Sequence, residues 1–247
     1  MAALYDIHGN LPALEAVLRE VEAEAVELVL VGGDVAAGPM PVETIERLAG
    51  LGPRARFVRG NADRYMVEVF DSGPQERYSP LANWPALQLQ PAHRDLLAGF
   101  EPSVELDLDG LGRVLFCHAT PASDEPIITV ATPEPVVAAA LAETEVPLVV
   151  AGHTHMQFDR RVGDGRMVNA GSVGMPYADQ PGAYWALLGP DVSLRRTVYD
   201  FEAAATAVRG TDFPGRDKFA EGIHRPPSAE EAAAEFERRA GRGSQPS

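Results

Sequence analysis

Four of the six histidines in this chain occur in short motifs that also carry two aspartates and an asparagine. Imidazole nitrogens, carboxylate oxygens and an amide oxygen, with no thiolate among them, suit Mn²⁺, Fe, Zn²⁺ or Ni²⁺ better than a cysteine-type structural zinc site. These residue types therefore predict a site for divalent metal ions. The seven residues are Asp6, His8, Asp34, Asn61, His118, His153 and His155.

The number of side chains indicates more than one ion. Seven ligands exceed what a single four-coordinate ion uses. Two ions that share a bridging carboxylate account for the excess, and such ions lie roughly 3.5–4 Å apart in phosphate-ester hydrolases. Polar residues also gather where loops begin, but that explanation covers one or two of the seven and not four of the six histidines. We therefore expect a two-ion hydrolase.

The motifs come directly after short apolar runs that are rich in valine and leucine. Such runs predict buried strands. In an open α/β sheet the carboxyl ends of the strands share one edge, where such folds build their sites. Five separate segments should therefore meet in one crevice. The runs cover residues 3–5, 28–31, 55–58, 114–117 and 147–151.

Local spacing supports this convergence. Asp6 and His8 are two residues apart, as are His153 and His155, and in an extended chain each pair projects to one side. A glycine precedes three of the seven residues and lets the backbone bend sharply and approach closely.

Helical patterns alternate with these strands. Asn10 should cap a helix that has Pro12 in its first turn. Strand–helix alternation followed by hairpins predicts an α/β domain with mixed sheets over residues 1–200. The other signals are helices at 42–49 and 133–143, hairpin turns at 109–110 and 163–165, and antiparallel strands at 183–188 and 192–199.

Residues 201–247 differ in character and predict a helical extension. Ser228 and Glu231 form a capping-box signature for a helix that ends near Gly241. The surface of this helix offers little for packing beyond Phe236, so we expect it to dock weakly or to mediate a contact. The last residues, 243–247, should be disordered. The choice of substrate should depend on two loops in the first 200 residues, 64–90 and 119–135.

The charge and cysteine content restrict the class of protein. A formal net charge of −15, from 36 acidic and 21 basic side chains, disfavours binding to nucleic acids or anionic membranes. Cys117 is the single cysteine, which excludes an internal disulfide and suits a reducing cytoplasm. We find no signal segment or apolar run long enough to span a bilayer. We expect a cytoplasmic protein that acts on a small phosphoester, and the sequence is compatible with a homo-oligomer.

The motifs also resemble a known family. Five segments, 6–10, 33–34, 60–61, 117–118 and 152–155, occur in the order found in the calcineurin-like metallophosphoesterases. The segment 169–176 strengthens a narrower resemblance to their small bacterial and archaeal phosphodiesterase branch. The resemblance implies a four-layer α/β/β/α sandwich, in which two packed mixed sheets are flanked by helices.

The resemblance also implies a role for each ligand. One metal ion would be held by Asp6, His8 and His155, and the other by Asn61, His118 and His153, while Asp34 would bridge the two. Of these, Asp34, Asn61 and His118 should act most directly in catalysis. The cofactors would be two divalent ions (Mn, Fe, Zn or Ni), with Mn²⁺ favoured, and a hydroxide on the metals would attack phosphorus.

One position departs from the family pattern. Many relatives place a histidine directly after the Gly-Asn motif to assist the leaving group, whereas this chain has Ala62. The absence favours phosphodiesters over monoesters with poor leaving groups. We expect Asp63 to support a ligand histidine and Arg64 to reach phosphate. The alternatives are a phosphomonoesterase, a nucleotide pyrophosphatase, or a metal-binding scaffold without catalysis.

Overall fold

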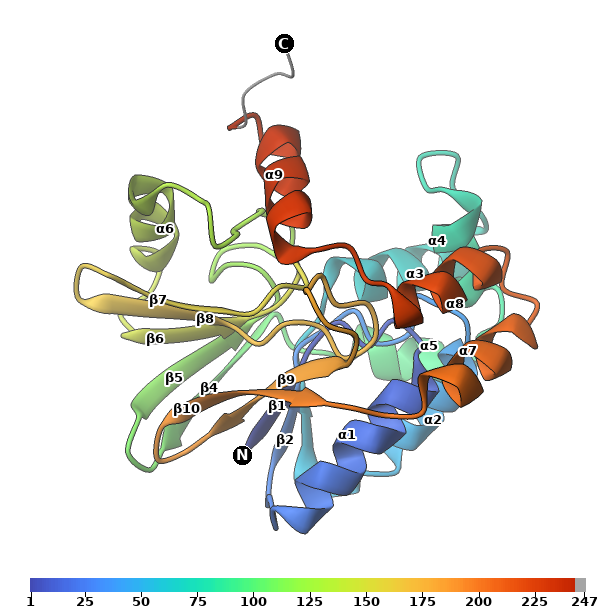
Figure 1. Cartoon of the computed structure of the whole chain (residues 1–247), viewed down its shortest axis with the longest axis horizontal. Helices are drawn as coiled ribbons and strands as arrows, with labels where there is room; N and C mark the ends of the chain where they lie inside the picture. Colours follow the sequence, from blue (N-terminus) through green and yellow to red (C-terminus); the bar gives the residue numbers. More distant parts are fainter. Residues whose placement is uncertain (243–247) are drawn as a thin grey trace.

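Two five-stranded sheets pack against each other in the computed structural model, which describes residues 1–242 (Figure 1). The first sheet has the strand order β10-β9-β1-β2-β3 and the second the order β4-β5-β6-β8-β7. Each combines three neighbouring parallel strands with antiparallel ones, so the predicted mixed α/β fold is confirmed. The strands are β1 (Ala2–Leu4), β2 (Val29–Val31), β3 (Ala55–Phe57), β4 (Ser103–Leu108), β5 (Gly112–Cys117), β6 (Leu148–Ala151), β7 (Phe158–Val162), β8 (Gly165–Asn169), β9 (Ala183–Leu188) and β10 (Val192–Thr197).

The apolar runs are continuous because both faces of each sheet are buried. Successive side chains of a strand point to opposite faces. In β1, Ala3 packs between the sheets, whereas Ala2 and Leu4 pack against the outer helices. In β5, Phe116 faces the first sheet and Cys117 faces outward, so Cys117 is a core residue.

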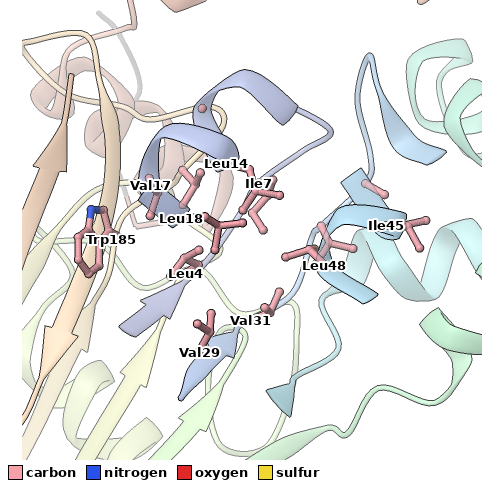
Figure 2. Packing of buried hydrophobic residues seen from close by; sticks show 14 of the residues in the cluster. Leu4, Ile7, Leu14, Val17, Leu18, Val29, Val31, Ile45, Leu48 and Trp185 are labelled. Atoms are coloured by element: carbon pink, nitrogen blue, oxygen red, sulfur yellow. The ribbon is translucent and has the colours of Figure 1, made fainter. Parts of the chain in front are cut away.

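Helices cover the outer face of each sheet and complete four layers. Figure 2 shows Leu14 and Leu18 of α1 (Leu11–Ala23) near Leu4 of the first sheet. Leu48 of α2 (Pro41–Ala49) lies against the same sheet. On the other side, α6 (Glu134–Leu141) packs on the second sheet. The α/β/β/α arrangement implied by the family resemblance is therefore confirmed.

The segment 64–90 is largely helical, and the prediction of a long loop there is wrong. Only Asp63, Met66 and Val69 of its first helix are buried, so the apolar stripe is too narrow to stand out in the sequence. His93 accepts a hydrogen bond from the Gln90 backbone N–H at 3.1 Å and caps the next helix. The helices of this region are α3 (Asn61–Ser72), α4 (Pro80–Ala86) and α5 (Pro91–Ala98).

Three further helices follow the last strand, namely α7 (Phe201–Arg209), α8 (Arg216–His224) and α9 (Ala229–Arg239). Ser228 caps α9 as predicted, accepting a hydrogen bond from the Glu231 backbone N–H at 3.2 Å. Of the two alternatives, the structure favours a contact over weak docking, because the alanines of α9 pack on Met156 and its buried Glu237 accepts hydrogen bonds from Thr129 and Thr132. None of the helices in residues 1–242 is both long and apolar enough to cross a membrane. The disorder predicted for residues 243–247 lies outside the described part of the chain.

Candidate metal centre

The carboxyl ends of four strands meet at one place and bring six of the seven predicted side chains together. Within each of two groups, one candidate ligand atom per residue lies within 4.8 Å of the others. One group holds Asp6, His8 and His155, and the other holds Asp34, His118 and His153. The paired histidines near the end of β6 divide between the groups, since His155 joins the first and His153 the second.

The backbone of these residues is not the extended chain that their spacing suggested. Asp6, His8, Asp34, His153 and His155 have φ values between 46° and 66°, in the left-handed region. They are five of the six non-glycine residues with positive φ in residues 1–242. This conformation costs roughly 1–2 kcal/mol per residue, and such outliers gather at functional sites. The residues of both pairs do lie at the centre, but the extended backbone from which their convergence was predicted is wrong.

Each candidate carboxylate is oriented by a backbone N–H group. The His153 N–H donates to Asp6 Oδ2, and the Ala62 N–H donates to Asp34 Oδ1, both at 2.8 Å. The other oxygen of each carboxylate faces the histidines. Asp6 Oδ1 lies 3.4 Å from His155 Nε2, and Asp34 Oδ2 lies 3.5 Å from His118 Nε2. One oxygen per residue is thus left for a cation.

Backbone carbonyls fix the imidazole rings in the same way. The Nδ1 atoms of His8, His118 and His155 lie 3.3, 2.9 and 2.8 Å from the carbonyl oxygens of Ala37, Gly32 and Met175. A ring that donates from Nδ1 to a carbonyl presents a lone pair at Nε2, which is how metal-ligating histidines are usually held. The ring of His153 is reversed, with Nε2 3.1 Å from the Glu125 carbonyl and Nδ1 turned towards His118.

The donor atoms fit a pair of divalent cations. Asp6 Oδ1 and Asn61 Oδ1 are buried without a hydrogen-bond partner among the described residues, and a buried oxygen of this kind needs one. His8 Nε2 and His155 Nε2 lie 3.1 Å apart, although neither ring has a proton there if both donate from Nδ1. Asp34 Oδ2 is 3.8 Å from His8 Nε2 as well as near His118, so it lies between the two groups.

Two glycines, Gly33 and Gly60, allow the loop after β2 and the loop after β3 to approach each other closely. A Cβ on Gly33 would lie 2.5 Å from the backbone nitrogen of Gly60, and a Cβ on Gly60 would overlap the Asp34 carboxylate. Neither clash can be relieved by moving the end of a flexible side chain. This close approach brings Asn61, the residue after Gly60, beside Asp34.

Mutual electrostatics keep the acids ionised. Burial alone would raise the pKa of the Asp6 carboxyl, but His155 and His118 hold it below its ordinary value. His118 and His8 outweigh burial in the same way and lower the pKa of Asp34. Burial would lower the pKa of His118, but Asp34 raises it to about 10. Burial and the charge of His118 lower the pKa of His153 to about 4.

Asp63 supports the site differently from its prediction. Its carboxylate contacts no ligand histidine but accepts hydrogen bonds from the backbone N–H groups of Asp34, Val35 and Gly60 at 2.8, 3.0 and 2.8 Å. It therefore ties the loop after β2 to the start of α3. Burial and the charge of Asp34 raise the pKa of Asp63 to about 7, against the lowering effect of these N–H groups.

Arg64 also differs from its prediction. Its guanidinium, expected to reach phosphate, pairs instead with Asp124 at 2.9 Å and Glu125 at 2.8 Å. Glu125 is the residue whose carbonyl contacts His153. Arg64 therefore contacts the centre through this acidic loop.

The segment 169–176 is a support beneath the centre. Ser172 Oγ donates to the Asp6 carbonyl at 2.7 Å and accepts from the Met175 N–H at 2.8 Å. The Met175 carbonyl in turn contacts His155. Asn169 Nδ2 donates to the Gly152 carbonyl at 2.5 Å. These bonds show that the segment holds the backbone around Asp6, Gly152 and His155 in place.

Residues 1–189, which include all seven candidate ligands, match the family model of the calcineurin-like phosphoesterase superfamily domain. The chain belongs to this superfamily. The resemblance drawn from the five motifs is thereby confirmed. The superfamily uses divalent metals, in agreement with the two groups of potential ligands.

Solved structures share the fold over most of this phosphoesterase chain. A metallophosphoesterase from Sphaerobacter thermophilus is 25% identical, with a TM-score of 0.69 over 90% of this chain and 96% of that one. A hypothetical protein from Pyrococcus horikoshii is 20% identical and has a TM-score of 0.78 over 92% of this chain and 98% of that one. The second likeness concerns the fold alone.

This phosphoesterase also has a shorter match to a curated relative. A symmetrical bis(5'-nucleosyl)-tetraphosphatase from Yersinia pestis is 35% identical in an alignment of 86 residues that covers 32% of this chain. The match spans only 30% of the length of that relative.

Proposed function

We propose that this chain is a binuclear metallophosphoesterase that hydrolyses phosphodiesters. The observation that carries the proposal is the position of Asp34, whose Oδ2 lies 3.8 Å from His8 Nε2 in one group and 3.5 Å from His118 Nε2 in the other. A carboxylate between two histidine-containing groups suits a bridge between two ions. Mn²⁺ is the cation we favour.

Each ligand would have a definite part. Asp6, His8 and His155 would hold one cation, and Asn61, His118 and His153 the other. When bound, the two cations supply positive charge for the phosphate oxygens and lower the pKa of a water molecule. The chain itself fixes the imidazole rings through backbone carbonyls, so the ligands need little rearrangement when a cation binds.

The experiment is a phosphoester panel assayed with the chain loaded with Mn²⁺. Turnover of bis(p-nitrophenyl) phosphate that is lost with a chelator and restored by Mn²⁺ supports the proposal. Two bound ions with no turnover of any ester would instead favour a metal-binding scaffold of the same fold.

Substrate preference should follow from Ala62. Because no histidine follows Asn61 to assist the leaving group, monoesters with poor leaving groups such as phosphoserine should be cleaved at least roughly a hundredfold more slowly than bis(p-nitrophenyl) phosphate, an estimate from the usual contribution of general acid catalysis. The measurement is kcat/KM for the two substrates at equal metal loading. Equal values for the two would refute this preference.

A second candidate is cleavage of a nucleotide pyrophosphate linkage. The short match to a symmetrical bis(5'-nucleosyl)-tetraphosphatase favours it. A dinucleoside tetraphosphate added to the panel distinguishes the two functions. A kcat/KM for this compound well above that for bis(p-nitrophenyl) phosphate would select the second.

A further inference from the structure

An aromatic stack connects the candidate metal centre to the C-terminal helix α9. The ring of Tyr177 stacks on His155, with 5.2 Å between centroids and 17° between planes. The same Tyr177 ring also contacts Phe236 of α9, with 5.8 Å between centroids and 58° between planes. The face of His155 turned to Tyr177 is therefore supported by a residue 81 positions later in the chain, and α9 lies beyond residue 189, where the family match ends.

A buried carboxylate forms a second connection from α9. Glu237 is 7% exposed and accepts hydrogen bonds from the hydroxyls of Thr129 at 2.8 Å and Thr132 at 2.5 Å. Arg242 pairs with the same carboxylate at 2.6 Å and donates to the Ile127 carbonyl at 2.7 Å. A buried charge with this many partners fixes the position of the segment it contacts.

The loop around residues 125–132 also contacts the turn 153–155, which carries His153 and His155. Thr154, which lies between His153 and His155, donates its hydroxyl to the Ile128 carbonyl at 2.9 Å. His153 Nε2 contacts the Glu125 carbonyl from the same loop. The turn 153–155 is thus held from two sides, and it supplies one histidine to each of the two groups.

We infer that α9 is a positioning element of the centre and that Phe236 sets the orientation of His155 through Tyr177. The inference rests on the proposed two-ion function. Without the Phe236 ring, Tyr177 loses part of its packing and restrains His155 less, so that the His155 ring depends more on its hydrogen bond to the Met175 carbonyl. The cation held with Asp6 and His8 should then bind more weakly, while the other should be less affected.

The test is competition for Mn²⁺ between a chelator and the full-length chain, comparing wild type with Phe236→Ala. Residues that orient a metal ligand typically contribute 10–100-fold to metal affinity, so one of two Mn²⁺ ions should weaken by about that factor. Phe236→Tyr keeps the ring and should retain wild-type affinity. Phe219→Ala is the matched control, since Phe219 is also a partly buried phenylalanine but packs in the separate α7–α8 cluster.

Two results would overturn the inference: unchanged affinity for both ions in Phe236→Ala, or an equal loss in Phe219→Ala. If Phe236→Ala does not fold, Arg242→Gln tests the second connection, since it releases the Ile127 carbonyl at a partly exposed position. It should also weaken Mn²⁺ binding, and wild-type binding would again count against the inference. The proposed function is tested separately by the wild type, which must bind two ions for that proposal to hold.

Discussion

Asp34→Asn should lower the turnover of bis(p-nitrophenyl) phosphate by more than roughly a thousandfold, because even residues that only orient a ligand typically cost 10–100-fold. Asparagine keeps the shape of the side chain and can still accept the hydrogen bond from the Ala62 N–H. It lacks the negative charge between the two groups and turns an N–H₂ towards them. The chain should therefore remain folded but lose the bridge.

The measurement is kcat/KM in saturating Mn²⁺, with Asp159→Asn as the matched control. Asp159 is an exposed residue of β7 that pairs with Arg166 at 2.6 Å and belongs to neither ligand group. The control should keep wild-type turnover. A variant at position 34 that retained a tenth of the wild-type rate would contradict the assignment of Asp34.

Asp63→Ala should have the largest effect on stability. It removes the acceptor for three buried backbone N–H groups, those of Asp34, Val35 and Gly60. A buried donor left without a partner costs about 1–3 kcal/mol, so the free energy of unfolding should fall by about 3–5 kcal/mol if the loops relax in part. Binding of metal should weaken too, since the loop carrying Asp34 loses its anchor.

Urea unfolding measures this effect, and Asp71→Ala is its control within the same helix. Asp71 is an exposed aspartate that pairs with Arg94 at the surface, so its removal should change the unfolding midpoint little. Asp63→Asn keeps one acceptor oxygen and should fall between Asp63→Ala and the wild type. An Asp63→Ala chain as stable as the Asp71→Ala chain would show that the three N–H groups do not depend on this carboxylate.

The sequence predicted the strands well because their signal is local. Runs that are buried on both faces are apolar throughout, and the polar residue after each run marks the sheet edge. The convergence of Asp6, Asp34 and His118 follows from this alone. The left-handed backbone at Asp6 and His8 could not be predicted from spacing, because an i, i+2 pair projects to one side in an extended chain regardless of how the folded chain bends.

The packing of α9 and the contacts of Asp63 were missed because their signals depend on distant partners. In α9 the buried surface consists of small alanines and an acid, and Glu237 is buried only because Thr129 and Thr132 lie against it from more than a hundred residues away. Asp63 similarly resembles an ordinary helix-start acid, and its contact with Asp34 appears only in three dimensions. A buried charged residue of this kind has no local pattern that separates it from an exposed one.

The central claim is that two cations bind one centre and that hydrolysis needs both. A titration of the metal-depleted full-length chain with Mn²⁺ tests it directly, with bound Mn²⁺ and turnover of bis(p-nitrophenyl) phosphate measured in the same samples. We predict that binding saturates at two ions per chain and that turnover appears only as the second ion binds. Saturation at one ion with full turnover, or turnover without any metal, would contradict the account.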